Sequence, residues 1–236
     1  MKKYFEKIYK KDFNSFIKEL RQRIEREEKS FIITANPETL MIGKEKPVFD
    51  EILKSEKTLI VPDGIGVVKA ANILGYPLKE RITGVEIVEE LLKIIDEKKK
   101  TIYLFGAKQE VMERFVEKIE QNYQNAKVVG YQNGYVKDKD AVFKEMIALK
   151  PDVVLVALGI PMQETLIYKY YDQFSKGIFI GVGGSFDVLS GTKKRAPKIF
   201  IKLNLEWLYR IAKEPKRIKR FYNSNVKFIT EIKKLR

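Results

Sequence analysis

Leu59-Ile60-Val61-Pro62-Asp63-Gly64-Ile65-Gly66-Val67-Val68 begins as a short apolar run, turns at a proline and an acid, and becomes apolar again after two glycines. This pattern predicts a buried strand that carries the Asp63 carboxylate at its C-terminal end, where the chain turns into a helix. In open α/β sheets, ligands bind outside the carboxyl ends of the strands. We therefore expect Asp63 to be the reactive group of a site that the rest of the chain builds.

Strands and helices alternate through most of the chain. The predicted strands are 31–35, 58–61, 101–105, 126–130, 152–158 and 178–182. The predicted helices are 4–28, 37–43, 47–54, 64–74, 84–95, 109–122, one ending at 150, one ending near 172, and 199–211. Short strands alternating with longer helices are typical of a parallel, layered sheet. The fold class is therefore α/β: a Rossmann-like, mostly parallel sheet with flanking helices, followed by a basic helical C-terminal appendage.

The composition narrows the possible chemistry. The 236 residues are 44% hydrophobic and 33% charged, as in a globular protein, and include no cysteine and no histidine. These absences exclude thiolate nucleophiles, Ser-His-Asp chemistry and cysteine-ligated metal sites, so a general base must be Asp, Glu, Lys or Tyr. The first residues are too charged to begin a signal peptide, and no apolar run is long enough to span a bilayer. We expect a cytoplasmic protein.

Positive charge gathers at the C-terminal end. Residues 192–236 contain 15 of the 46 Lys and Arg residues but only three of the 32 acids. We therefore divide the chain into an α/β catalytic domain, 1–191, and a basic C-terminal appendage, 192–236. Lys202, Glu206 and Arg210 are spaced to form one charged stripe on the otherwise apolar helix 199–211. Basic and aromatic residues then alternate through 216–222, which suits a membrane interface or a nucleic acid.

Small or polar residues follow most predicted strands, at 34–37, 62–64, 105–108, 159–163 and 181–184. Such turns can place backbone N–H groups and a helix N-terminus against a phosphate, and together they favour a nucleotide-type ligand. Taken singly, each is ordinary turn chemistry, and Asp63 alone reads best as an Asp-Gly turn. The Rossmann glycine fingerprint and the P-loop are both missing. Asp138 and Asp140 form a D-x-D pattern, but capping of the next helix explains it better, so we assign no metal and no cofactor.

The ordered set of turns resembles the WecG/TagA/CpsF family of bacterial glycosyltransferases, most closely its TagA branch, from about Phe31 to Tyr222. The first matching motifs are Thr34-x-Asn36, Pro62-Asp63-Gly64-x-Gly66, Arg81-x-Thr83-Gly84 and Leu104-Phe105-Gly106-Ala107. The later ones are Ala157-Leu158-Gly159-x-Pro161-x-Gln163-Glu164, Gly181-Val182-Gly183-Gly184-x-Phe186-Asp187, Gly191-x-x-x-Arg195-Ala196-Pro197 and Leu205-Glu206-Trp207-Leu208-Tyr209-Arg210-x-x-x-Glu214-Pro215-x-Arg217. One departure is Glu86, where the motif leads us to expect Asp.

The resemblance implies an inverting transfer of N-acetylmannosamine from a UDP-sugar donor to lipid-diphosphate-linked N-acetylglucosamine, an intermediate of wall teichoic acid. It implies Asp63 as the catalytic base. For the leaving diphosphate, we expect help from Arg210, Arg217 and Arg220, whose planar forks match phosphate oxygens. The expected substrate-binding residues are Thr34, Asn36, Arg81, Thr83, Gly106, Ala107, Gly134, Tyr135, Gly159, Gln163, Gly184 and Asp187.

The appendage would dock on anionic lipid at the inner face of the cell membrane and bring its arginines over the site. This interpretation needs no nucleic-acid partner and allows a homo-oligomer. The alternatives are a related family branch that uses another UDP-sugar for capsule or surface polysaccharide, a basic nucleic-acid-binding protein, and a nucleotide-dependent oxidoreductase.

Overall fold

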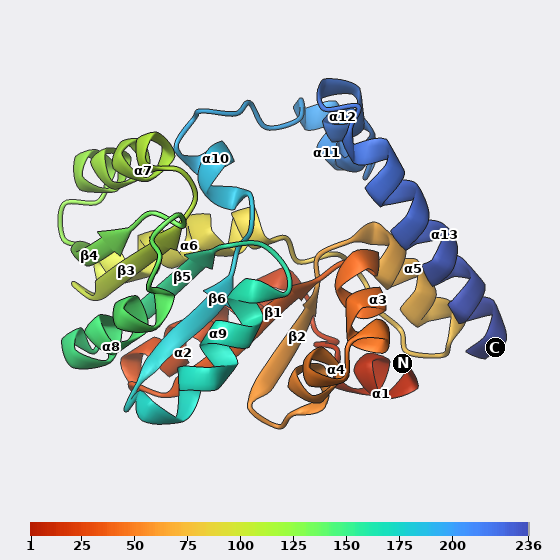
Figure 1. Cartoon of the computed structure of the whole chain (residues 1–236), viewed down its shortest axis with the longest axis horizontal. Coiled ribbons are helices and arrows are strands. Elements are labelled where there is room, and N and C mark those ends of the chain that lie inside the picture. The colour runs from red at the N-terminus through yellow and green to blue at the C-terminus, as the bar shows by residue number, and fades with distance from the viewer. Residues whose placement is uncertain (236) are drawn as a thin grey trace.

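The computed structural model describes residues 1–235, without the side chains of Arg217 and Arg220. Its centre is a six-stranded sheet in which every strand pairing is parallel, in the order β2-β1-β6-β5-β3-β4 (Figure 1). The strands are β1 (Lys29–Ala35), β2 (Thr58–Pro62), β3 (Thr101–Gly106), β4 (Lys127–Gln132), β5 (Val153–Ala157) and β6 (Gly177–Gly181). The predicted α/β fold class is confirmed.

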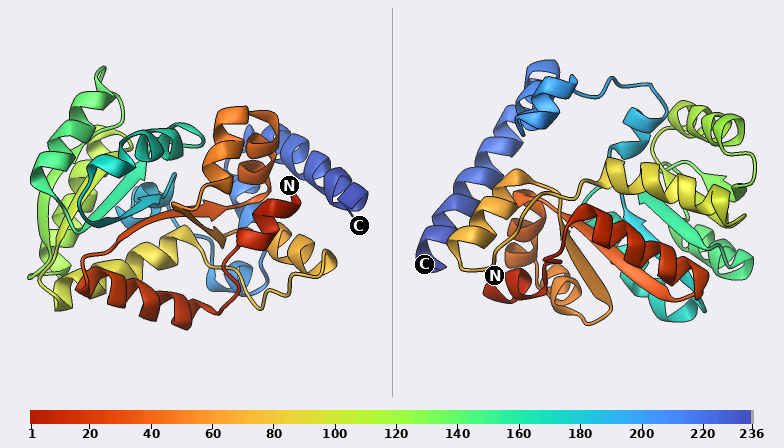
Figure 2. Two further views of the ribbon diagram at one scale, coloured as in Figure 1. Left: turned by 90° about the horizontal axis from the view of Figure 1, so that it is seen from below. Right: turned by 180° about the vertical axis from the view of Figure 1, so that it is seen from behind.

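Helices cover both faces of this sheet, because the central strands are apolar on both sides. In β1, Phe31 and Ile33 join one core cluster and Ile32 joins the other. The first face carries α1 (Lys2–Lys7), α3 (Pro37–Glu45), α4 (Pro47–Lys54), α5 (Ile65–Ile73), α8 (Lys139–Leu149), α9 (Met162–Tyr170) and the 3-10 turn Tyr171–Gln173. The second carries α2 (Phe13–Glu25), α6 (Gly84–Glu97), α7 (Gln109–Asn122) and α10 (Ser185–Leu189) (Figure 2).

Two predicted helices are interrupted. The predicted helix 4–28 splits into α1 and α2, because Ile8 forms a bridge to Ile60 at the sheet and Asp12 caps α2 by accepting from the Ser15 N–H. The predicted helix 199–211 splits into α11 (Lys198–Lys202) and α12 (Glu206–Lys213). Asn204 between them adopts a left-handed φ of 59°, which ends the first helix. Consequently, Lys202 does not share one helix with Glu206 and Arg210.

The C-terminal residues pack against the body at the end opposite α7 and α8 (Figure 1). The last helix, α13 (Arg217–Leu235), lies on α3 and α5. Its Phe228 and Ile232 are buried in the first core cluster. Ion pairs from Glu231 to Lys44 and from Lys227 to Glu45 flank this contact. The appendage therefore shares the core of the body through α13.

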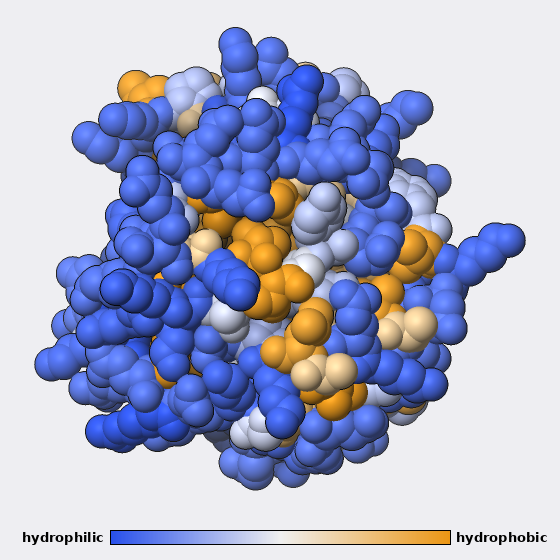
Figure 3. Space-filling model, turned by 90° about the vertical axis from the view of Figure 1, so that its left-hand side faces the viewer, coloured by the Kyte–Doolittle hydropathy of each residue, from blue (hydrophilic) through white to orange (hydrophobic). Residues whose placement is uncertain are grey.

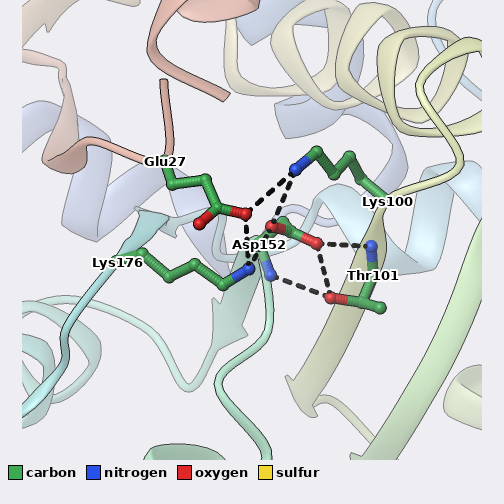
Figure 4. A network of polar contacts seen from close by, with 5 residues as sticks. All are labelled: Glu27, Lys100, Thr101, Asp152 and Lys176. Atoms are coloured by element: carbon green, nitrogen blue, oxygen red, sulfur yellow. Dashed lines mark hydrogen bonds and ion pairs between the residues drawn. The ribbon is translucent and has the colours of Figure 1, made fainter. Parts of the chain in front are cut away.

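A polar network closes the amino-terminal edge of the sheet, at the start of β3 and β5 (Figure 4). Asp152 is buried and accepts hydrogen bonds from the backbone and hydroxyl of Thr101, at 2.9 and 2.7 Å. Lys176 pairs with Asp152 at 2.8 Å and with Glu27 at 3.1 Å, and Lys100 reaches the same two acids. Burial by itself raises the pKa of Asp152, but its bonds from Lys176 and Thr101 hold that pKa below the ordinary value. This network is structural, because it lies at the edge opposite the strand C-termini.

Candidate active site

The carboxyl edge of the sheet gathers the predicted turn residues. Because all strands are parallel, the turns after all six of them lie along this one edge. The strand order divides these turns into two groups. One group follows β2, β1 and β6 and contains Asp63. The other follows β5, β3 and β4 and contains Gly106 and Gly134.

Asp63 is held in place by its backbone. Its N–H donates to the carbonyl of Ala35 at 2.9 Å, which joins the turn after β2 to the end of β1. The next residue is tightly packed, because a Cβ at Gly64 would lie 3.1 to 3.3 Å from atoms of Asn36 and Pro37. In turn, Asn36 caps α3 by accepting from the Thr39 N–H at 3.0 Å. The Asp-Gly and Asn-Pro patterns thus fix two neighbouring turns at the same point of the edge.

Thr83 and Glu86 lie at the N-terminal end of α6, next to the turn of Asp63. Thr83 is buried and caps α6, and its hydroxyl donates to Glu86 Oε2 at 2.7 Å. The other oxygen of Glu86 pairs with Arg195 at 2.9 Å. This accounts for the acid at position 86: the carboxylate completes the cap of α6 and holds Arg195 of the appendage. Gly84 brings α6 close to β1, since a Cβ there would lie 3.6 Å from Thr34 Cγ2.

The Asp63 carboxyl is within electrostatic range of two arginines and one acid. The group lies deep among protein atoms although part of the residue reaches the surface, and this burial raises its pKa to about 6. The positive charges of Arg210 and Arg81 lower the pKa of Asp63, and so does a hydrogen bond from the backbone of Gly84. The negative charge of Glu206 raises that pKa. At neutral pH most of the carboxyl is ionised, with a pKa suited to a general base. The sequence indicates Asp63, Arg81 and Arg210 as site residues, whereas it indicates Glu206 only as part of a charged stripe.

Arg81 connects the body to the appendage. Its guanidinium donates to the carbonyl of Ile201, at 3.4 Å, and pairs with Glu206 at 3.5 Å. Glu206 also pairs with Arg210 at 2.6 Å, four residues along α12. Of the three predicted catalytic arginines, Arg210 has a described side chain, and its charge lowers the pKa of Asp63. The side chains of Arg217 and Arg220 lie outside the described residues, so their roles stay predictions.

A cavity of about 240 Å³ opens at the other end of the edge. It lies between the turns after β3, β4 and β5, where the Gly134 N–H donates to the carbonyl of Ala107 at 2.9 Å. Its lining residues are Ala107, Gly134, Tyr135, Lys139, Ala157, Leu158 and Met162. Gly106 beside it must be glycine, because its φ is 129° and a Cβ would meet Ala157 O at 2.3 Å. Figure 3 shows the side of the molecule that carries α7 and α8, where apolar surface gathers in a hollow within a hydrophilic surround.

Gln163 lies beneath the turns after β5 and β6. Its side-chain oxygen accepts from the backbone N–H groups of Gly159 and Gly183, at 3.1 and 3.2 Å. Its amide nitrogen donates to Glu164 Oε1 at 2.7 Å. Both glutamine and glutamate are about 2% exposed, and burial raises the pKa of Glu164 to about 7. These bonds tie two turns together, while the expected contact of Gln163 with a sugar stays a prediction. Glu164 belongs to the sequence motif, which indicates no role for it.

The remaining predicted residues lie around α10 and α8. Gly184 is exposed at the start of α10, and the Asp187 carboxylate lies 3.5 Å from Lys193 Nζ of the appendage. Asp138 accepts from the Ala141 N–H at 2.9 Å and caps α8, as the sequence indicated, and Asp140 pairs with Lys169. Within residues 1–235, no group of three or more acidic side chains is placed to hold a metal ion. None of the described helices is long and apolar enough to cross a membrane.

Comparisons with known proteins give one consistent result. Residues 6–236 match the model of the Glycosyl transferase WecG/TagA/CpsF family. Three curated relatives carry the name N-acetylglucosaminyldiphosphoundecaprenol N-acetyl-beta-D-mannosaminyltransferase. The relative from Bacillus spizizenii is 39% identical over 94% of this chain and 86% of its own length. The relative from Bacillus subtilis is 46% identical over 80% of this chain and 73% of its own length. The relative from Staphylococcus aureus (strain MW2) is 41% identical over 80% of this chain and 74% of its own length.

Proposed function

The chain belongs to the WecG/TagA/CpsF family of glycosyl transferases, and from this premise we propose that it transfers N-acetylmannosamine from a UDP donor to undecaprenyl-diphosphate-linked N-acetylglucosamine. The names of its curated relatives state this sugar and this acceptor for those proteins. The product is the disaccharide lipid of wall teichoic acid synthesis. A basic nucleic-acid-binding protein and an oxidoreductase are not favoured by these relatives.

Asp63 is the base of this transfer. In an inverting reaction, a base takes the proton of the acceptor hydroxyl while the oxygen attacks the anomeric carbon, and UDP departs from the opposite face. The observation that carries the proposal is the setting of Asp63: a carboxylate with a raised pKa of about 6, at the carboxyl edge of the sheet, within electrostatic range of Arg81 and Arg210. Histidine and cysteine are absent from the chain, so the carboxylate has no competitor of those types.

The two groups of turns serve different parts of the substrates. The cavity lined by Ala107, Gly134 and Tyr135 takes the uridine of the donor, and Lys139 supplies a positive charge at its wall. Thr34, Asn36 and Thr83 lie around Asp63, where the sugars meet. Arg210, with Arg217 and Arg220, neutralises the charge that develops on the departing diphosphate.

The appendage brings the enzyme to its lipid-linked acceptor. Several large apolar side chains of this segment are exposed, namely Ile199, Leu203, Leu208, Ile218, Tyr222 and Ile229. Exposed lysines such as Lys198, Lys202, Lys213 and Lys219 accompany them. Apolar side chains beside lysines suit the interface of an anionic bilayer. Peripheral binding at the inner face of the membrane would place Asp63 within reach of the acceptor headgroup.

Product analysis tests the function directly. The protein is incubated with UDP-N-acetylmannosamine and a lipid-diphosphate N-acetylglucosamine, and the lipid product is identified by mass spectrometry. The expected product gains the mass of one N-acetylhexosamine residue, and UDP is released. UDP-N-acetylglucosamine and UDP-glucose serve as competing donors. Preferred transfer from another donor would assign the chain to a different branch of the family, and absence of any transfer would refute the proposal.

A further inference from the structure

Glu206 is a buried acid in a segment whose other two acids lie nearer the surface. It is 7% exposed although it stands in the first turn of the short helix α12, within the most basic part of the chain. A buried carboxylate is stable only when charged or hydrogen-bonded partners compensate for the lost water. The role of Glu206 can therefore be inferred from the residues that it pairs with.

Both partners of Glu206 are arginines that belong to the proposed site. One carboxylate oxygen pairs with Arg81 of the body at 3.5 Å, and the other pairs with Arg210 of the appendage at 2.6 Å. The Arg81 side chain is also nearly buried, whereas about half of the Arg210 side chain is exposed. A half-exposed arginine on a surface helix has many rotamers, and fixing it costs conformational entropy. The bond to a buried carboxylate selects one direction for Arg210.

The same contact fixes the appendage. Arg81 donates to the carbonyl of Ile201 at the end of α11, and pairs with Glu206 at the start of α12. It therefore contacts the appendage on both sides of the turn at 203–205. The residue after Arg81 is bound to the end of β2, because the Ile82 N–H donates to the Pro62 carbonyl at 2.7 Å. The backbone of Arg81 is therefore held at the end of the strand that leads to Asp63.

We propose that Glu206 is a positioning residue: it joins Arg210 to Arg81 and so holds the Arg210 guanidinium beside Asp63, where the departing diphosphate needs it. This inference rests on the proposed function, because it assigns Arg210 to the leaving group. Glu206 itself touches neither substrate. It acts on transfer through Arg210, so the loss of transfer on its removal requires Arg210, whereas the loosening of the start of α12 does not.

A double-mutant cycle tests this claim. Glu206→Gln keeps the volume and removes the charge, and we expect kcat/KM for transfer to fall by about tenfold to a hundredfold, as for a misplaced catalytic group. In an Arg210→Ala background the same change should alter kcat/KM by less than about twofold, since the two residues act as one unit. Equal losses in both backgrounds would overturn the proposal, and so would faster transfer by Glu206→Gln, which would mean that the carboxylate competes with the diphosphate.

A second measurement does not depend on activity. Trp207, the only tryptophan, follows Glu206 directly and stacks on Phe221 with ring centroids 4.5 Å apart. If Glu206 fixes the start of α12, acrylamide should quench Trp207 fluorescence more strongly in Glu206→Gln than in the parent. Unchanged quenching would overturn the positioning role.

The control is Glu231→Gln, which removes the same charge from α13, where Glu231 pairs with Lys44 and Lys234. It should leave both transfer and Trp207 quenching unchanged. Circular dichroism of each variant shows that it is folded. Glu206→Asp keeps the charge but is too short to span both arginines, so it should change transfer and quenching in the same direction as Glu206→Gln and by less. If the parent protein transfers no sugar, the proposed function fails, whereas the quenching experiment still decides the placement of α12.

Discussion

Asp63→Asn should make the folded protein more stable and the enzyme inactive. The carboxyl has a pKa of about 6 in the folded state, against an ordinary value of 3.8, chiefly because it is buried. The folded state therefore holds this proton more tightly than the unfolded chain. The stability that the group contributes is fully present below pH 3.8 and is lost as the pH rises through 6.

The size of the effect follows from the same two pKa values. A difference of one pKa unit corresponds to about 1.4 kcal/mol, so ionised Asp63 lowers the free energy of unfolding by about 3 kcal/mol above pH 6. Asparagine has no charge at any pH and avoids this loss. The difference in unfolding free energy between Asp63→Asn and the parent should therefore increase, in favour of the variant, by up to about 3 kcal/mol between about pH 4 and pH 7.5. In a chain of this length that corresponds to roughly 6 to 12 °C in Tm.

Urea or thermal unfolding of both proteins at several pH values measures this difference, and comparing pH values cancels any pH-independent effect of the amide. Transfer should fall by a factor of about 100 or more in the variant, as for the loss of a general base, while UDP binding is retained. For the parent, kcat/KM should decline about tenfold per pH unit below pH 6. A stability difference that does not change with pH would refute the burial of the carboxylate, and near-normal turnover would refute its role as base.

Asp152→Asn should lower the free energy of unfolding by about 3 kcal/mol, because it leaves Lys176 and Lys100 without their buried partner, and the kcat of the folded fraction should not change. The pKa of Asp152 lies below its ordinary 3.8 in the folded state, so its stabilisation is present above that pH and is lost in acid; thermal unfolding at neutral and acid pH checks both points. Phe228→Ala should cost about 3 to 5 kcal/mol and expose α13 to limited proteolysis, whereas unaltered protease resistance would contradict the shared core. Ile218→Asp should weaken sedimentation with anionic liposomes without changing transfer to a water-soluble acceptor analogue; unaffected liposome binding would argue against docking by this segment.

The sequence determined the alternating strands and helices and the chemistry of their junctions. Local pattern was sufficient there, because β-branched runs, Asn-Pro and Asp-Gly turns act over only a few residues. The predicted order of elements from 31 to 182 matches the structure. The breaks within the predicted helices 4–28 and 199–211 were not predicted, because apolar periodicity carries no signal of their causes. Ile8 pairs with Ile60, far along the chain, and Asn204 takes a left-handed conformation within an otherwise apolar helical pattern.

Candidate site residues show the same division. Asp63 could be singled out from its position after a strand and from the absence of histidine and cysteine. The pKa of its carboxyl could not, because it depends on burial and on Arg210, Glu206 and Arg81, which are separated from it by 18 to 147 residues. A spacing of four residues predicted one charged stripe of Lys202, Glu206 and Arg210, of which Glu206 and Arg210 do pair, but it gave no sign that Arg81 joins them.

Sequence by itself therefore determined which side chains stand at the carboxyl ends of the strands. Only the tertiary structure decided which of them meet, because the strand order places the turn of Asp63 in one group and that of Gly106 in another. It also decided that the appendage contacts the body next to the turn of Asp63, through Arg81. Helix α13 docks through apolar side chains that are buried only in the assembled core. Arg81 attaches α12 through its ion pair with the buried carboxylate of Glu206, and the two charges meet only in the folded protein.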